Sequence, residues 1–92
     1  MERKSILQAE KECWYTGETY ELHKHHIFGG ANRKNSEKYG LWVWLRPDKH
    51  VGSGGVHENR SMDLELKQTA QAAFEQAHSR EEFMRIFGRN WL

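Results

Sequence analysis

Half of the histidines in this 92-residue chain fall within four consecutive positions, and this cluster constrains the fold more than any other feature. The cluster contains His23, His25 and His26, and two more histidines, His50 and His57, flank a glycine-rich turn after the next apolar run. Imidazole titrates near neutral pH and is the commonest metal ligand in proteins. Such a cluster is typical of a metal-dependent hydrolytic site, of a purely structural zinc site, or of a histidine patch on the surface.

The composition leaves little material for a hydrophobic core. Apolar residues make up 37% of the chain, and the mean hydropathy is −0.95. We expect one domain over residues 1–92, in the size range in which a bound metal often supplements burial. No apolar run is long enough to cross a bilayer, and no signal-peptide pattern opens the sequence. Because Cys13 is the only cysteine, no internal disulfide can form, and we expect a soluble cytoplasmic protein.

The net charge of +1 is unevenly distributed. Residues 24–50 carry six basic and two acidic side chains, a balance of +4, whereas residues 58–92 carry five basic and six acidic ones, a balance of −1. The positive charge therefore accompanies the histidines, where a polyanionic substrate would need it. A solvated loop of mixed charge would give the same count.

The first predicted strand covers residues 19–28, which include β-favouring Tyr20, Leu22 and Ile27. Successive side chains of a strand point to opposite faces, so a regular strand would direct His25 and His26 opposite ways. We therefore expect the strand to end or bend at this pair. Residues 29–40 contain glycines, asparagines and basic side chains without apolar periodicity, which predicts a loop.

The clearest strand signal is the apolar run over residues 41–45. Both of its faces are apolar, so we expect it to be covered on both sides, by the C-terminal helix and by the N-terminal segment. Trp42 and Trp44 share one face; core packing is their commonest role, and base stacking or a partner contact are the alternatives.

Helical signals follow that strand. Pro47 ends it, and residues 48–50 can open a short helical turn before the glycines. Apolar residues recur at helical spacing over residues 62–78. A second, short helix is predicted to begin after Ser79, with Glu82 at capping-box spacing, and to end at Gly88. Residues 13–17 read as a turn.

The order of these elements resembles the His-Me finger, or ββα-metal, nucleases, and most of all their HNH endonuclease branch. That family shows an Asp-His or His-His pair, a loop, the block Leu-Cys-x-x-Cys-His and often a later histidine. Here the pair is His25-His26, and the second block is Leu45-Arg46-Pro47-Asp48-Lys49-His50, without either cysteine. An upstream Cys-x-x-Cys is matched by Cys13-Trp14-Tyr15-Thr16, with one cysteine absent. This core resemblance covers residues 13–57.

Short HNH-type proteins of phages and prophages are similar in two further stretches. One combines residues 25–30 with residues 35–40, and the other is the ending Phe-Gly-Arg-Asn-aromatic, matched by residues 87–91. The joint absence of three knuckle thiolates is expected of a chain that lost a structural zinc and kept the nuclease core.

The resemblance implies an α+β fold with a ββα-metal core, a two-stranded antiparallel hairpin and C-terminal helices. It places the core at residues 13–78 and a helical extension at residues 79–92. It further implies a metal-dependent endonuclease or nickase that hydrolyses DNA phosphodiester bonds. His25 takes the metal-ligand place, His26 the general-base place, and His50 and His57 the helix-side ligand places of the all-histidine branch.

One divalent ion is implied, and the sequence leaves Zn²⁺, Mg²⁺, Mn²⁺ and Ni²⁺ open. His57 is favoured over His23 as the third ligand, and His23 is then expected beside the ligands. The family's middle asparagine falls on Leu41, so Asn32 or Asn35 is considered for orienting His26.

The expected partner is DNA, contacted through the phosphates by a set of basic side chains: Lys24, Arg33, Lys34 and Lys38. No membrane is expected, and a homodimer or a phage protein partner stays open. The alternative function is a non-catalytic, zinc-stabilised nucleic-acid-binding domain, and a third is a protein-interaction module.

Overall fold

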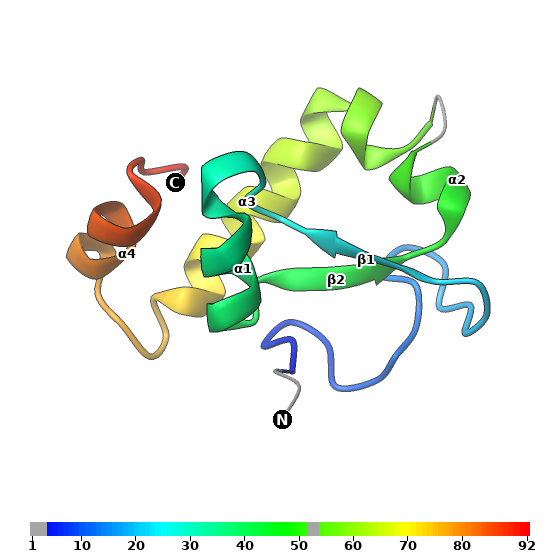
Figure 1. Ribbon diagram of the computed structural model, residues 1–92, viewed down its shortest axis with the longest axis horizontal. Coiled ribbons are helices and arrows are strands. Elements are labelled where there is room, and N and C mark those ends of the chain that lie inside the picture. The colour runs from blue at the N-terminus through cyan, green and yellow to red at the C-terminus, as the bar shows by residue number, and fades with distance from the viewer. Residues whose placement is uncertain (1–3, 52–53) are drawn as a thin grey trace.

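The computed structural model describes residues 4–51 and 54–92 (Figure 1). The α+β class expected from the sequence is confirmed, with a two-stranded antiparallel hairpin and helices around it. Residues 1–3, and Gly52 and Ser53 of the glycine-rich turn, lie outside the described residues. In chain order the elements are β1 (His23–His26), η1 (Gly30–Asn32), α1 (Arg33–Tyr39), β2 (Trp42–Leu45), α2 (Pro47–His50), η2 (Val56–Glu58), α3 (Arg60–Phe74) and α4 (Arg80–Phe87).

The register of the hairpin separates the two adjacent histidines. In β1 and β2, His25 pairs with Val43 and His26 pairs with Trp42. Directly opposed residues of an antiparallel pair lie on the same face. His25 therefore shares the buried face of Val43, whereas His26 shares the other face with Trp42. The strand ends at His26, as the sequence indicated.

β1 is shorter than the strand predicted over residues 19–28. Glu21 has a positive φ of 48°, which breaks the extended conformation before the hairpin begins. Arg46 holds this bend, because its Nη1 donates to the carbonyl oxygens of Tyr20 (2.9 Å) and Glu21 (3.3 Å). The chain therefore enters the sheet only at His23.

The prediction of a loop over residues 29–40 is wrong, because this segment contains η1 and helix α1. Gly40 ends α1 in the left-handed conformation, with φ at 72°. The buried Ser36 fixes the helix to the end of β1: its hydroxyl donates to the Phe28 carbonyl oxygen (2.8 Å) and accepts from the Phe28 N–H (3.0 Å). α1 thus lies directly beside the histidine strand.

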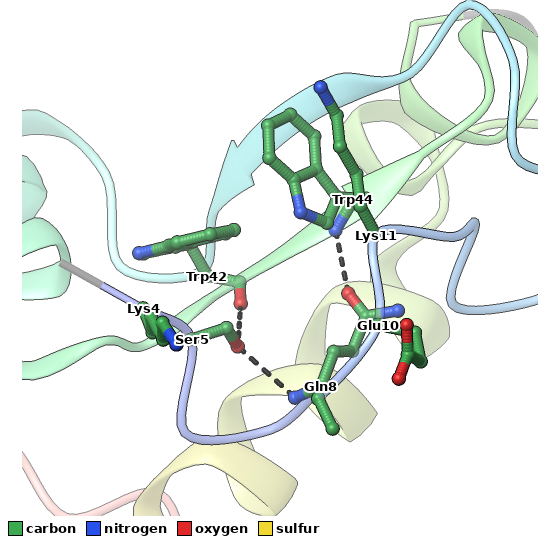
Figure 2. Close-up of a pocket in the computed structure, with 8 residues that line it drawn as sticks. Lys4, Ser5, Gln8, Glu10, Lys11, Trp42 and Trp44 are labelled. Atoms are coloured by element: carbon green, nitrogen blue, oxygen red, sulfur yellow. Dashed lines mark hydrogen bonds between the residues drawn. The ribbon is translucent and has the colours of Figure 1, made fainter. Parts of the chain in front are cut away.

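The N-terminal segment runs along the free edge of β2 and bonds to its backbone, whereas the sequence predicted that this segment covers one face of the strand (Figure 2). Ser5 Oγ donates to the Trp42 carbonyl oxygen (2.6 Å), and the Trp44 N–H donates to Gln8 Oε1 (2.8 Å). Trp42 is buried and Trp44 half-buried, in agreement with a packing role. A hollow of about 450 Å³ remains between this segment and the two indoles, and no histidine lines it.

Helix α3 is displaced from its predicted range of 62–78. It begins earlier because Asn59 caps it, with its side-chain oxygen accepting from the Met62 N–H (3.1 Å). It ends at Phe74, four residues before the predicted end. α3 supplies Leu66, Ala70 and Phe74 to the core.

The second short helix, α4, begins and ends as predicted. Ser79 accepts from the Glu82 N–H (3.0 Å), and Gly88 is left-handed. Phe83 and Phe87 stack at 4.7 Å between ring centroids, and both pack with Phe28. These rings join one core cluster that also holds the buried face of β2: Leu41, Val43 and Leu45. Within the described ranges, the search for a helix long and apolar enough to cross a membrane finds none.

Candidate metal centre

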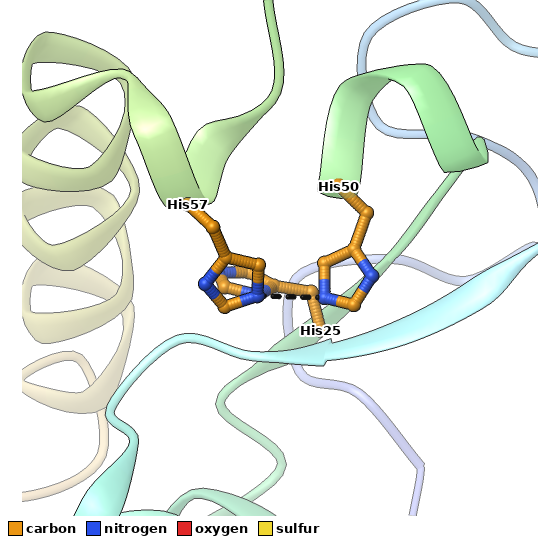
Figure 3. Close-up of side chains that lie close together, drawn as sticks. All are labelled: His25, His50 and His57. Carbon is orange, nitrogen blue, oxygen red and sulfur yellow. Dashed lines mark hydrogen bonds between the residues drawn. The ribbon is translucent and has the colours of Figure 1, made fainter. Parts of the chain in front are cut away.

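Three histidines from three elements meet at one point (Figure 3). His25 belongs to β1, His50 is the last residue of α2, and His57 lies in η2. Each offers a ligand nitrogen, and these nitrogens all lie within 4.8 Å of one another. Pro47 begins α2, and His50 ends it. The contacts of this short helix with both strands and with η2 fix the position of His50.

The imidazoles contact one another directly. His50 Nε2 and His57 Nε2 are 2.9 Å apart, and the His25 ring lies 5.0 Å from the His57 ring and 5.3 Å from the His50 ring between centroids. His25 is only 4% exposed, and its Nε2 is buried without a hydrogen-bond partner in the described structure. A buried polar atom without a partner costs free energy, and binding a metal ion through this nitrogen would remove that cost.

The cluster favours neutral imidazoles. Burial, followed by His57 and His50, lowers the pKa of His25 to about 3. Burial, followed by His57 and His23, lowers the pKa of His50 to about 4. At neutral pH both rings are therefore unprotonated on one nitrogen, which is the form that binds a metal.

These donors fit a divalent ion of the transition series. Imidazole suits zinc and nickel, whereas magnesium prefers oxygen. Bonds of about 2.0 Å in a tetrahedron put ligand nitrogens roughly 3.3 Å apart. In this cluster one separation is 2.9 Å, and no pair of ligand nitrogens is more than 4.8 Å apart. Small ring rotations would therefore bring His25, His50 and His57 onto one ion.

A hollow of about 290 Å³ opens beside this cluster. It is lined by the three histidines together with Lys24, His26, Gly29, Gly30 and Arg33. His26 thus faces the same space as the three clustered histidines, although it comes from the opposite face of the hairpin. Gly29 and Gly30 line the hollow without side chains.

His26 has an acidic neighbour that the sequence did not indicate. Glu37 Oε1 lies 3.7 Å from His26 Nε2 and 3.2 Å from Lys24 Nζ. Burial lowers the pKa of His26, while the Glu37 carboxylate opposes that shift. Glu37 reaches the strand only because α1 is a helix, and Gly40, a typical C-cap residue, was the signal that could have revealed it.

His23 lies behind the cluster, at the position expected for a residue supporting a ligand. Its Nδ1 is 3.1 Å from His50 Nδ1, on the side of the His50 ring opposite the Nε2 that faces His57. If His50 binds an ion through Nε2, its proton sits on Nδ1 and is donated to His23. His23 is not in the group of converging ligand nitrogens, which contains His25, His50 and His57.

The other residues considered from the sequence are dispersed. Lys34 and Lys38 are exposed on α1 and do not line the hollow, unlike Lys24 and Arg33. The amides of Asn32 and Asn35 are engaged elsewhere, because they donate to the carbonyl oxygens of residues 87 (3.0 Å) and 86 (3.4 Å) at the end of α4. These asparagines tie α1 to α4, and the expectation that one of them orients His26 is replaced by the contact with Glu37.

Comparisons with models of protein families, with curated proteins and with solved structures find no match for this chain. The geometry of the described residues is therefore what supports any functional assignment.

Proposed function

We propose that this chain is a metal-dependent endonuclease or nickase that hydrolyses DNA phosphodiester bonds on a ββα-metal core. One observation carries the proposal. Three imidazoles, those of His25, His50 and His57, converge on one point, while a fourth, His26, lines the same hollow outside that group. A structural zinc site is normally closed by four protein ligands, whereas a hydrolytic site keeps a position open beside three ligands and adds a separate proton acceptor.

The residues divide the work of phosphodiester hydrolysis. An ion held by His25, His50 and His57 would reduce the charge on the phosphate and stabilise the leaving oxygen. His26 takes the proton of the attacking water, since burial keeps its pKa low and its imidazole neutral at pH 7. Lys24 and Arg33, which line the hollow, attract and position the phosphate.

The second candidate is a non-catalytic, zinc-stabilised nucleic-acid-binding domain. The buried, unpartnered Nε2 of His25 favours it, because an ion bound there would link β1, α2 and η2 and contribute to folding. Both candidates require the metal, so metal binding alone does not separate them.

Cleavage of supercoiled plasmid separates the two. The metal-free protein is incubated with plasmid and Mg²⁺, Mn²⁺, Zn²⁺ or Ni²⁺, each with and without chelator, and the nicked and linear forms are quantified. We expect cleavage with at least one ion and none with chelator. DNA and zinc binding without cleavage by any ion would refute the endonuclease and leave the binding domain.

A matched pair of variants excludes a contaminating nuclease. His26→Ala removes the proposed proton acceptor, and His78→Ala removes a histidine that is exposed beyond α3. General-base contributions are typically about 100- to 10,000-fold, so His26→Ala should lower the cleavage rate by that range while His78→Ala keeps it. Equal rates in the two variants would count against the assignment of His26.

A further inference from the structure

Two more hollows lie along α3, and the first shares His57 with the hollow beside the clustered histidines, which we call the histidine hollow. His57 also lines a second hollow of about 320 Å³, which it shares with Arg60 and Asp63. Arg60 and Asp63 in turn line a third hollow of about 340 Å³, which extends to Lys67 and to the C-terminal segment. We call these two hollows together the α3 groove and define it by six of their lining residues: His57, Arg60, Asp63, Lys67, Arg89 and Trp91.

The α3 groove is basic although its part of the sequence is not. Residues 58–92 carry one more acidic than basic side chain. The acidic side chains that line the two hollows are Glu58 and Asp63, while the basic ones are Arg60, Lys67 and Arg89. Asp63 is paired with Lys67 at 2.8 Å, which leaves the exposed Arg60 and Arg89 against the exposed Glu58, a net of one positive charge.

Trp91 fixes the far end of the α3 groove. The backbone N–H of Trp91 donates to Gln71 Oε1 (2.8 Å), and its backbone carbonyl oxygen accepts from Gln68 Nε2 (3.0 Å). These two hydrogen bonds attach the C-terminal segment to α3. The Lys67 ammonium lies 4.4 Å and the Arg89 guanidinium 4.0 Å from the centre of the Trp91 ring. Cation–π contacts of this kind hold both cations at the groove.

Arg60 and Lys67 of the α3 groove lie on one helix, seven residues apart. From Arg60 to Lys67, α3 rises roughly 10 Å at about 1.5 Å per residue. This length corresponds to roughly three nucleotides of one DNA strand, at about 3.4 Å each.

We propose that the α3 groove binds the phosphodiester backbone of the DNA strand beside the scissile phosphate, with Arg60 and Arg89 as phosphate contacts. The proposal rests on the proposed function and names a part of its DNA surface outside the basic residues near the histidines. The lining residues shared with the histidine hollow and the net charge of +1 support a polyanionic strand as the occupant. The contacts carry no base readout, so binding is independent of sequence.

Salt dependence of DNA binding tests the groove. The wild type and the variants Arg60→Gln, Arg89→Gln and Arg85→Gln are titrated against a fluorescent duplex in chelator, at several salt concentrations. Arg85 is the matched control, because it is an exposed arginine of α4 that does not line the groove. The slope of log K against log[salt] should fall by about 0.9 in each groove variant and stay unchanged in the control. Groove variants that behave like the control would overturn the proposal.

Two further measurements keep this result separate from other failures. Arg89→Lys retains the charge and should retain the salt slope, whereas loss of the slope with it would indicate a structural effect and refute a phosphate contact. With metal, the groove variants should raise KM for duplex cleavage and leave hydrolysis of bis(p-nitrophenyl) phosphate unchanged, because this small diester does not reach Arg60 or Arg89. If the wild type cleaves neither substrate, the endonuclease proposal fails, while the binding slopes still decide the groove.

Discussion

Acid should destabilise the metal-free protein through His25. Burial, with His57 and His50, lowers the pKa of His25 from its ordinary value of 6.5 to about 3. Below pH 6.5, the unfolded chain therefore binds a proton that the folded chain does not bind. The stabilisation that depends on neutral His25 is fully present above that pH and is lost as the pH falls towards about 3.

The expected loss is large for a chain of this size. Each pH unit between the two pKa values costs about 1.4 kcal/mol for one such group. From pH 6.5 to about 4.5, His25 alone removes about 2 kcal/mol from the free energy of unfolding. Small domains are stable by roughly 5–15 kcal/mol in total. His50, whose pKa is lowered to about 4, acts in the same direction.

Urea unfolding of the metal-free protein, followed by far-UV circular dichroism at several pH values, measures this loss. Carboxylates contribute to acid sensitivity in every variant, so the slope due to His25 is the difference between the wild type and His25→Asn. His78→Gln removes an exposed histidine far from the cluster and should keep the wild-type slope. If His25→Asn loses as much stability on acidification as the wild type, then His25 is not held neutral in the folded protein, and the reasoning fails.

Three further perturbations test the site and its scaffold. In metal titrations and single-turnover cleavage assays, His57→Ala should lose metal affinity and activity together, whereas His26→Ala should lose activity alone. Loss of metal affinity in His26→Ala would contradict the role of His26 as proton acceptor. Glu37→Gln should lower kcat without weakening metal binding, because the carboxylate contacts His26 and not the ligand group; an unchanged kcat would make this contact incidental. Gly40→Ala should destabilise the protein more than Gly88→Ala in thermal melts. Both residues have a positive φ (72° and 83°), which costs an alanine about 1–2 kcal/mol at either position. Of the two, only Gly40 has backbone close to the added Cβ, at 2.5 Å from the Lys4 carbonyl oxygen. Equal destabilisation would show that the close approach is relieved.

Elements with local signals were predictable from the sequence. The apolar run of β2, the proline that begins α2, and Ser79 and Gly88 at the ends of α4 each specify a boundary through their own chemistry. The approach of His25, His50 and His57 followed from the resemblance to a family pattern, and the structure brings these three together.

Elements fixed by tertiary contacts were missed. Helix α1 has no apolar stripe, because Ser36 is its one buried residue and makes polar contacts with Phe28. Periodicity therefore had nothing to detect, and the contact between Glu37 and His26, which depends on α1, was missed with it. β1 begins later than predicted for a similar reason, since the side chain of Arg46 fixes the bend at Glu21 from outside the strand.

The missed helix also determines which of two adjacent histidines joins His50 and His57 in the converging group. A shift of one residue in the pairing of β1 with β2 would exchange the faces of His25 and His26. β1 has only four residues, so its own ladder specifies the register weakly. Directly after it, the Ile27 N–H donates to the Leu41 carbonyl oxygen (3.1 Å), and Ser36 holds Phe28 through both backbone groups. A slip would break these buried hydrogen bonds, at a cost of about 1–3 kcal/mol for each group left unpaired. The register, and with it the burial of His25 and the position of His26 in the basic hollow, is therefore fixed from α1.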